Sequence, residues 1–561
     1  MASLDMFLDS LLFLIPLLHL LAAPHTKVEE SFNLQATHDI LVYGTPTSAP
    51  SARLSATYDH FAFPGAVPRT FLGAVLLAGL GQPLVWLAGF QHAQLVVRAV
   101  LGTFNAGCLL VFRNALAEAC GNGAARWWVA LMVSQFHVAY YVSRTLPNMF
   151  AFGLTTLALA FLLPKTDARR ASVRRRQALG LLVLATAIFR SELAILLAVV
   201  GLHLLVTKQM TLGNLIPLFL GTFIAALAMS VPVDSYFWQK PVWPELWGFY
   251  YNAVLGSSSN WGVSPWHYYF TSALPRLFLN PLAIPLVVFA LLQPGTSLRA
   301  RSMVVPSLLY IAIYSLQPHK ETRFIFYAIP PLTGAAALGA SFISTRRSKS
   351  VHYGLATLVL VLSILTTFVC GMAMLLLSSL NYPGGDALSQ LYAIARTDSS
   401  SPTTVTVHAD VLTCMTGLTL FGQNHAGLPL ALQGQPLPTT DLAATPVFLF
   451  DKTEERPELK WPNFWMKMDY ALMEDPTLAL GNWKTVGVVH GYDGIEVLKP
   501  GADEAGPEGN RQGYRVLGLG ASVARARNTV RRLTGGWWVG PRMVPRIHIM
   551  KRVKDVQYAT A

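Results

Sequence analysis

The chain has 561 residues, of which 53% are hydrophobic and 13% charged, and its mean hydropathy is +0.43. Soluble domains carry about a quarter charged residues, so this composition excludes an ordinary soluble protein. The formal net charge of +13 is compatible with nucleic-acid binding, but much of the excess lies in short connections between apolar segments. We therefore expect membrane lipids, and no nucleic acid, as partners.

Apolar segments follow one another through the first two thirds of the chain. Most approach the roughly 20 residues that a membrane-spanning helix needs. We therefore expect a polytopic α-helical membrane protein with about 11–13 membrane segments. The segments comprise residues 7–24, 71–90, 94–112, 126–143, 148–163, 178–206, 212–230, 281–293, 303–316, 324–343 and 353–378.

Basic residues in the connections between these segments predict the orientation. They cluster at residues 165–176, 299–301 and 346–349, and the positive-inside rule assigns such connections to the cytoplasm. Because successive membrane spans cross in opposite directions, the intervening connections lie on the lumenal side. They include loops 25–66 and 231–275.

One inconsistency remains in this count. Three apolar segments separate the first loop from Arg144, yet two positions on the same side require an even number of crossings. Either one segment is re-entrant or one boundary is wrong.

Two charged residues interrupt the segment 178–206. Arg190 and Glu192 would be costly in the middle of the hydrocarbon. We therefore expect two short helices that meet in a lumenal hairpin.

The chain changes character near residue 380. Residues 1–379 form the expected transmembrane module, whereas residues 380–561 mix short apolar stretches with turn residues, as is typical of a small α/β domain. Alternation places this domain on the lumenal side. The short apolar stretches are residues 403–408, 446–450 and 485–489.

Two adjacent carboxylates, Glu29 and Glu30, lie in the first loop just after the first apolar segment. Transfer of a sugar to an alcohol needs a carboxylate that accepts the hydroxyl proton, and a like-charged neighbour raises the pKa of one member of such a pair. A solvated charged loop is the other interpretation, and the pair alone leaves both open. Asp59 and His60 of the same loop are candidates for binding substrate.

The loop 231–275 is rich in aromatic residues and holds five of the 13 tryptophans. Aromatic faces stack on sugars, but tryptophan and tyrosine also gather at membrane interfaces. Asp234 and Trp238 are the substrate-binding candidates in this loop, and membrane anchoring is the alternative for its aromatic rings.

Cations cluster on the face opposite the basic connections, at His319, Lys320 and Arg323. A lipid phosphate gives cations a reason to lie there, because they stabilise phosphate oxygens and the charge that departs during transfer. Arg144 and Arg190 are expected on the same side. Internal pairing with Glu321 or Glu192 is the alternative role.

At these segments the sequence resembles a known family, the GT-C mannosyltransferases that use dolichyl-phosphate-mannose. The resemblance spans about residues 26–330 and returns only at residues 381–385. Its motifs include Thr26-Lys27-Val28-Glu29-Glu30-Ser31-Phe32-Asn33, Tyr58-Asp59-His60, Pro68-Arg69-Thr70-Phe71, Arg144-Thr145-Leu146-Pro147-Asn148, Phe189-Arg190-Ser191-Glu192, Asp234-Ser235-Tyr236-Phe237-Trp238 and His319-Lys320-Glu321 with Arg323.

The resemblance implies a location and an activity. It implies an enzyme of the endoplasmic reticulum membrane with a lumenal active site. The expected reaction moves mannose from dolichyl-phosphate-mannose to a dolichyl-diphosphate-linked glycan with seven mannose residues, forms an α-1,6 linkage by inversion and uses no cofactor or metal ion.

The resemblance also implies that Glu29 and Glu30 occupy the family's acidic pair. The first member of that pair is usually aspartate and is taken as the catalytic base. Here it is glutamate, so either residue remains a candidate base, and position favours Glu29.

Two other functions remain open. A sister mannosyltransferase that acts on the GPI glycolipid is the nearest, although Lys27-Val28-Glu29-Glu30-Ser31 resembles the oligosaccharide branch. A lipid flippase or transporter also needs many helices, but such proteins usually show repeated halves and ionisable groups near the membrane midplane. Here the polar groups gather at one membrane face, which favours transfer at the surface.

Overall fold

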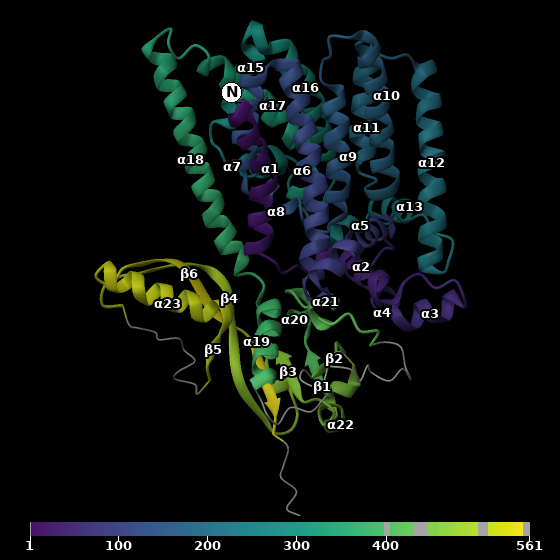
Figure 1. Ribbon diagram of the computed structural model, residues 1–561, viewed down its shortest axis with the longest axis vertical. Coiled ribbons are helices and arrows are strands. Elements are labelled where there is room, and N and C mark those ends of the chain that lie inside the picture. The colour runs from purple at the N-terminus through teal and green to yellow at the C-terminus, as the bar shows by residue number, and fades with distance from the viewer. Residues whose placement is uncertain (1, 398–403, 431–445, 455, 503–513, 554–561) are drawn as a thin grey trace, which may run out of the picture. The chain divides into compact units, whose positions relative to one another are not determined.

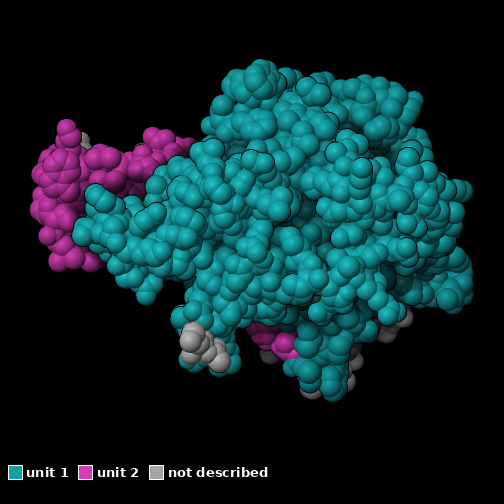
Figure 2. All heavy atoms as spheres, turned by 90° about the horizontal axis from the view of Figure 1, so that it is seen from above, with its two compact units in different colours: residues 1–22, 39–87, 95–375 teal, residues 23–38, 88–94, 376–561 magenta. Residues whose placement is uncertain are grey.

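The computed structural model describes residues 2–397, 404–430, 446–454, 456–502 and 514–553 (Figure 1). The chain forms two compact units, which Figure 2 colours separately. Unit 1 comprises Met1–Ala22, Asp39–Leu87 and Leu95–Leu375, and unit 2 comprises Ala23–His38, Ala88–Gln94 and Leu376–Ala561. The segment that carries Glu29 and Glu30 therefore belongs to the unit of the C-terminal third, which a division between residues 379 and 380 does not capture.

Unit 1 is built almost entirely from helices. Its α-helices are α1 (Ala2–Ala22), α3 (Pro50–Thr57), α4 (Asp59–Ala62), α5 (Leu72–Ala88), α6 (Ala93–Cys120), α7 (Asn122–Ser134), α8 (Phe136–Tyr141), α9 (Pro147–Leu162), α10 (Ala168–Leu184), α11 (Leu193–Val206), α12 (Leu212–Trp238), α13 (Pro244–Phe249), α14 (Leu274–Phe278), α15 (Ala283–Leu292), α16 (Pro294–Tyr314), α17 (Ile329–Ser344) and α18 (Val351–Ser379). Its shorter 3-10 and π-helical segments include η3 (Ala185–Phe189) and η7 (Thr322–Ala328).

Within the described residues, five helices are long and apolar enough to cross a membrane. They are Ser3–Ala22, Phe90–Cys120, Leu212–Trp238, Thr322–Ser344 and Val351–Ser379. The pair Tyr269–Phe278 and Ala283–Leu292, bent by 104°, makes a sixth if it is one broken span. Length and composition thus select fewer spans than the 11–13 expected, because other helices of unit 1 are shorter or contain charged residues.

Burial distinguishes the central helix from the peripheral ones. The apolar stretch that contains α17 is 94% buried, whereas those of α12 and α18 are 11% and 22% buried. Accordingly, α12 and α18 run along the outside of the helical layer in Figure 1. Their apolar side chains point outward, as lipid-facing helices require.

Helix α5, which corresponds to the expected segment 71–90, has 17 residues and is shorter than the helices long enough to cross a membrane. The N-terminal end of this helix is bonded to α12, since Phe71 N–H donates to Asp234 Oδ1 at 2.7 Å, and the segment that follows it, Ala88–Gln94, belongs to unit 2. In Figure 1, α5 lies near α13 at one end of the helical layer and does not run the height of the layer as α6 does. With α5 left out of the count, α6, α7 and α8 are the helices that separate the first loop from Arg144.

Two further predictions concern helix ends. The hairpin within residues 178–206 is confirmed, since α10 and η3 end at Phe189 and α11 begins at Leu193. The expected start of the long loop at residue 231 is wrong. Helix α12 continues to Trp238, because the apolar run Ala225–Met229 is followed by residues whose polar side chains are satisfied inside the unit.

Unit 2 contains a six-stranded mixed sheet with the order β2-β1-β3-β6-β4-β5. Strand β1 is parallel to β2 and β3, β6 is antiparallel to β3 and β4, and β4 is parallel to β5. The strands are β1 (Thr404–Ala409), β2 (Val447–Asp451), β3 (Tyr470–Met473), β4 (Trp483–Leu498), β5 (Val516–Leu517) and β6 (Trp538–Arg552), and the α-helices are α19 (Pro383–Thr397), α20 (Val411–Met415), α21 (Leu420–Gln423), α22 (Pro462–Trp465) and α23 (Gly518–Leu533). Helix α2 (Ser31–Tyr43) belongs to unit 2 up to His38 and to unit 1 from Asp39. The described parts of the three short apolar stretches noted in the sequence lie in or beside β1, β2 and β4.

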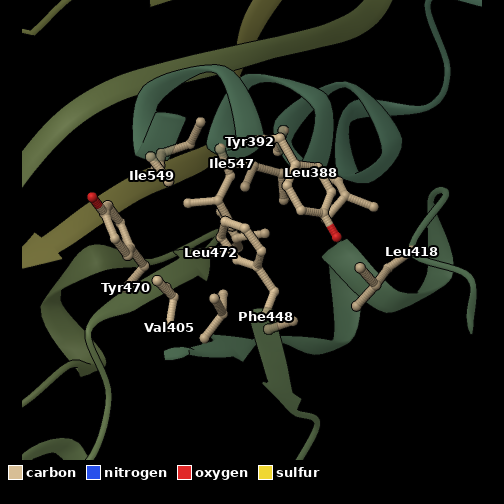
Figure 3. Close-up of a cluster of buried hydrophobic side chains, with 14 of the residues drawn as sticks. Leu388, Tyr392, Val405, Leu418, Phe448, Tyr470, Leu472, Ile547 and Ile549 are labelled. Carbon is tan, nitrogen blue, oxygen red and sulfur yellow. The ribbon is translucent and has the colours of Figure 1, made fainter. Parts of the chain in front are cut away.

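Helix α19 packs on this sheet and closes its core. Leu388 and Tyr392 of the helix lie against Val405, Phe448 and Ile547 of the strands (Figure 3). The alternation of apolar residues along β1 turns one face toward α19. The small α/β domain expected after residue 380 is therefore present.

Candidate active site

The two adjacent carboxylates lie in a 3-10 turn of unit 2, η1 (Val28–Glu30), which leads directly into α2. Glu30 is 4% exposed, and its side chain accepts a hydrogen bond from the Lys27 backbone N–H at 3.3 Å. Glu29 is exposed. Glu30 therefore stabilises the turn, whereas Glu29 presents its carboxylate to solvent, which favours Glu29 as the group that meets a substrate hydroxyl.

Residues from the other end of the chain hold this acidic turn. The Leu420 backbone N–H donates to Gln35 Oε1 at 2.9 Å. Gly385 packs so closely on His25 that a Cβ atom there would lie 2.3 Å from the ring nitrogen Nδ1. The segment that carries Glu29 is therefore positioned by the C-terminal third.

A second group of candidates surrounds the hairpin between α10 and α11 in unit 1. The π-helical turn η3 precedes Arg190, and π-helical turns are frequent at functional sites. Arg190 Nε donates to Glu192 Oε1 at 2.7 Å, and Asn148 Nδ2, at the start of α9, donates to the same oxygen at 3.1 Å. Glu192 is thus shared between a guanidinium and an amide.

The turn 319–323 contains further ion pairs. Arg323 Nε lies 2.6 Å from Glu321 Oε2, and His319 Nε2 lies 3.1 Å from Glu321 Oε1. Lys320 Nζ donates instead to the backbone carbonyls of Ser264 and Gln317. The internal pairs considered as an alternative role therefore form for Arg190, Arg323 and His319, whereas Lys320 has no carboxylate partner in the described part of the chain.

Phe324 connects the hairpin with this turn. The Cζ atom of Arg190 lies 5.3 Å from the centre of the Phe324 ring, and that of Arg323 lies 5.8 Å from it. The structure thus brings these two predicted cations together.

Arg69 joins them, although the sequence analysis did not select it as a site residue. It interacts electrostatically with Arg190 and Arg323, and burial together with these neighbours lowers the pKa of Arg69 to about 10. The guanidinium therefore stays charged at physiological pH. Its only signal in the sequence is its place in the motif Pro68-Arg69-Thr70-Phe71.

Glu245, an acidic residue of the aromatic loop, is the second residue of this group that was not among the predicted site residues. Its Oε2 accepts a hydrogen bond from the Ser191 backbone N–H at 2.5 Å. Burial, reinforced by Glu192 and opposed by Arg190, raises the pKa of Glu245 to about 8. The cationic cluster is defined as Arg69, Arg190 and Arg323 with Glu192, Glu245 and Glu321, and the raised pKa of Glu245 weakens the negative charge that opposes its three guanidinium groups.

Asp234 is fully buried, with 0% of its surface exposed. Its carboxylate accepts hydrogen bonds from Thr70 Oγ1 at 3.1 Å, the Phe71 N–H at 2.7 Å and Ser230 Oγ at 2.6 Å. Trp238 is also buried, and its Nε1 donates to the Arg69 backbone carbonyl at 2.9 Å. These contacts favour a role in positioning the segment around Arg69 over direct sugar contact.

The two candidates from the first loop lie beside the same segment. His60 is buried, its Nε2 lies 3.0 Å from the Phe237 carbonyl, and burial lowers the pKa of His60 to about 4. The Asp59 backbone N–H donates to Asp39 Oδ2 at 2.8 Å, and the Asp59 side chain is partly exposed. Of the two, Asp59 is the one open to a ligand.

Arg144 follows α8 and is buried. Its Cζ atom lies 4.0 Å from the centre of the Tyr140 ring, and its charge acts on His19 of α1. The structure therefore places Arg144 beside α1 and α8, a different set of helices from those that carry Arg190.

This arrangement of helices is the GT-C fold of membrane glycosyltransferases. It is similar to the crystal structure of ArnT from Cupriavidus metallidurans bound to undecaprenyl phosphate, with a TM-score of 0.54 and 13% identity, over 84% of this chain and 93% of that one. At this identity the likeness concerns the fold alone.

The chain belongs to the Alg9-like mannosyltransferase family, whose model matches residues 10–414. It is 33% identical to the Dol-P-Man:Man(7)GlcNAc(2)-PP-Dol alpha-1,6-mannosyltransferase of Saccharomyces cerevisiae over 527 residues, which cover 87% of this chain and 88% of the relative. GPI mannosyltransferase 3 of Yarrowia lipolytica is 26% identical over 319 residues, which cover 55% and 59%. The predicted family and class of enzyme are confirmed.

Proposed function

We propose that this chain transfers mannose from dolichyl-phosphate-mannose to a dolichyl-diphosphate-linked glycan with seven mannose residues, and that it forms an α-1,6 linkage at the lumenal face of the endoplasmic reticulum membrane. The donor, acceptor and linkage are those in the name of the yeast relative. The observation that carries the chemistry is the contrast between the exposed Glu29 and the buried Glu30, which gives one carboxylate free access to an acceptor.

In the proposed reaction, the acceptor 6-hydroxyl oxygen attacks the anomeric carbon of the donor mannose. The new carbon–oxygen bond forms as the bond to the phosphate oxygen breaks, and the electron pair of that bond leaves with dolichyl phosphate. Glu29 takes the hydroxyl proton. Attack opposite the leaving group inverts the β-linked mannosyl phosphate to an α-linkage, and no step requires a metal ion.

The leaving phosphate gains negative charge during this reaction, so cations that hold it bind the transition state more tightly than the ground state. The cationic cluster supplies such groups, because its three guanidinium groups lie beside the Glu245 carboxyl, whose pKa is raised to about 8. Lys320 and His319 flank the cluster on the same turn as Arg323. Burial lowers the pKa of Lys320. Arg144, which contacts Tyr140 and acts on His19, is the remaining proposed phosphate ligand.

The acceptor is tested by offering purified enzyme dolichyl-phosphate-mannose together with lipid-linked glycans of different mannose content and a GPI glycolipid. We expect mass spectrometry to show one added mannose on the seven-mannose glycan, and linkage-specific mannosidases to identify an α-1,6 bond. Transfer to the GPI glycolipid in its place would overturn the proposal.

The donor-phosphate role is tested by Lys320→Ala and Arg323→Ala. Both variants should raise the donor KM and lower kcat, while the acceptor KM barely changes. Arg276→Ala is the matched control, because Arg276 is exposed and bonds only locally, to Tyr268 and Ser272. A variant with reduced melting temperature but unchanged donor KM and kcat would show that its cation only stabilises the turn, through Glu321 for Arg323 and through backbone carbonyls for Lys320.

A further inference from the structure

A cavity of about 530 Å³ lies in unit 1, at the end of α10 and α11 that is away from the hairpin 190–192. It forms where α9 ends, α10 begins, α11 ends and α16 begins, four helices that lie together in Figure 1. Its inner wall is apolar. The wall residues include Leu159, Leu163, Val200, Leu204, Met303 and Pro306.

The mouth of this cavity is basic. Lys165, Arg175, Arg299 and Arg301 line it. Lys165 pairs with Glu118, and Arg175 Nη1 donates to the Gln209 carbonyl at 3.1 Å.

Arg299 and Arg301 are both exposed. Within the described residues neither has a carboxylate partner. Their positive charge is therefore available to a ligand at the mouth.

The cavity is also open toward the outer surface of the unit. Leu298 and Val305 line it, yet they are 83% and 41% exposed. In a helical unit whose outer surface is apolar, such side chains meet lipid. A molecule can therefore enter from the hydrocarbon and keep a polar end at the basic mouth.

An apolar chamber that opens to lipid and carries a cationic rim is complementary to a lipid with a negative headgroup. Arginine binds phosphate oxygens through its planar fork of N–H donors. We propose that this cavity binds one anionic glycerophospholipid, with an acyl chain along Val200 and Leu204 and the headgroup phosphate at Arg299 and Arg301. A free phosphate leaves the apolar wall unused, and a zwitterionic lipid brings no net charge to the rim.

This site is separate from the proposed transferase chemistry. No proposed catalytic or donor-binding residue lines the cavity, and α10 and α11 run between the cavity and Arg190. The proposal therefore stands or falls independently of the proposed mannosyl transfer.

The proposed lipid site is tested by native mass spectrometry of the purified full chain in detergent. Phosphatidylserine and phosphatidylcholine with identical acyl chains are the probes. We expect one phosphatidylserine to bind at least about tenfold more tightly than phosphatidylcholine. The double variant Arg299→Gln with Arg301→Gln should lose this preference. Both side chains are exposed, so the variant should fold, and a melting curve checks this.

The matched control is Arg347→Gln with Lys349→Gln, which removes the same charge from an exposed basic connection that does not line the cavity. We expect this variant to bind phosphatidylserine as the wild type does. Millimolar inorganic phosphate should not displace the lipid. Equal binding of the two lipids, full retention of phosphatidylserine by the Arg299 and Arg301 variant, or displacement by inorganic phosphate would each overturn the proposal.

Discussion

Replacing Glu29 with glutamine tests the proposed base directly. The side chain is exposed, so the substitution removes a charge without disturbing packing, and the melting temperature should not change. A positioned general base is worth about 10²- to 10⁴-fold in rate, which corresponds to about 3–5 kcal/mol of activation free energy. We expect kcat to fall within that range.

Glu30 provides the internal comparison. Glu30→Gln keeps an oxygen that can accept the hydrogen bond from the Lys27 N–H, so turnover should change by less than about tenfold. Glu30→Ala loses this bond, and the net loss of about 1 kcal/mol should appear as a lower melting temperature. We thus expect substitution of Glu29 to lower the reaction rate and substitution of Glu30 to lower the stability of the fold.

The assay is transfer from dolichyl-phosphate-mannose to the seven-mannose acceptor, with both substrates saturating so that kcat is measured. Parallel melting curves in detergent separate loss of chemistry from loss of fold. Near-normal turnover in Glu29→Gln, together with a collapse in Glu30→Gln, would assign the base to Glu30 and refute the reasoning from exposure.

Three further predictions follow from the buried polar groups and the fixed cations. Asp234→Asn replaces one of two carboxylate oxygens with N–H₂, which then faces either Ser230 or the pair Thr70 and Phe71. It should therefore lower stability by about 1–3 kcal/mol, measured as a lower melting temperature, and leave the acceptor KM unchanged. Because the pKa of Glu245 is raised from 4.5 to about 8, its contribution to stability is present below pH 4.5 and is lost as the pH rises through 8. Melting temperatures at several pH values should therefore fall less steeply in Glu245→Gln than in the wild type. Chelators should leave activity intact, because fixed cations assist the departing phosphate, and a loss that magnesium or manganese restores would contradict the metal-free reaction.

Local sequence features predicted the helices well and the sheet only in part. The length of the apolar runs and the cost of Arg190 in hydrocarbon are local properties, and both lead to the observed helices and hairpin. Strand β6 was missed because Trp538–Arg552 contains Pro541, Pro545 and several basic residues, which are unusual in strands. Its extended conformation depends on pairing along β4, which no local pattern reveals.

The candidate site shows the same limit. The acidic pair and the turn 319–323 stand out because charge is rare in this chain. The joining of Arg69 with Arg190 and Arg323 could not be predicted, since their proximity depends on how helices pack. Asp234 attracted attention as an acidic residue among aromatic rings, but its three hydrogen-bond donors come from its own helix and from the segment before α5.

The close packing of Gly385 on His25 bears on how variants of this enzyme are classified. A missense change at Gly385 would be grouped by its sequence position with defects of the C-terminal domain, yet any side chain there pushes against the residue four positions before Glu29. Such an allele should resemble a catalytic mutant. By the same reasoning, a shortened enzyme that ends after α18 keeps every predicted membrane helix but loses the groups that fix its acidic turn.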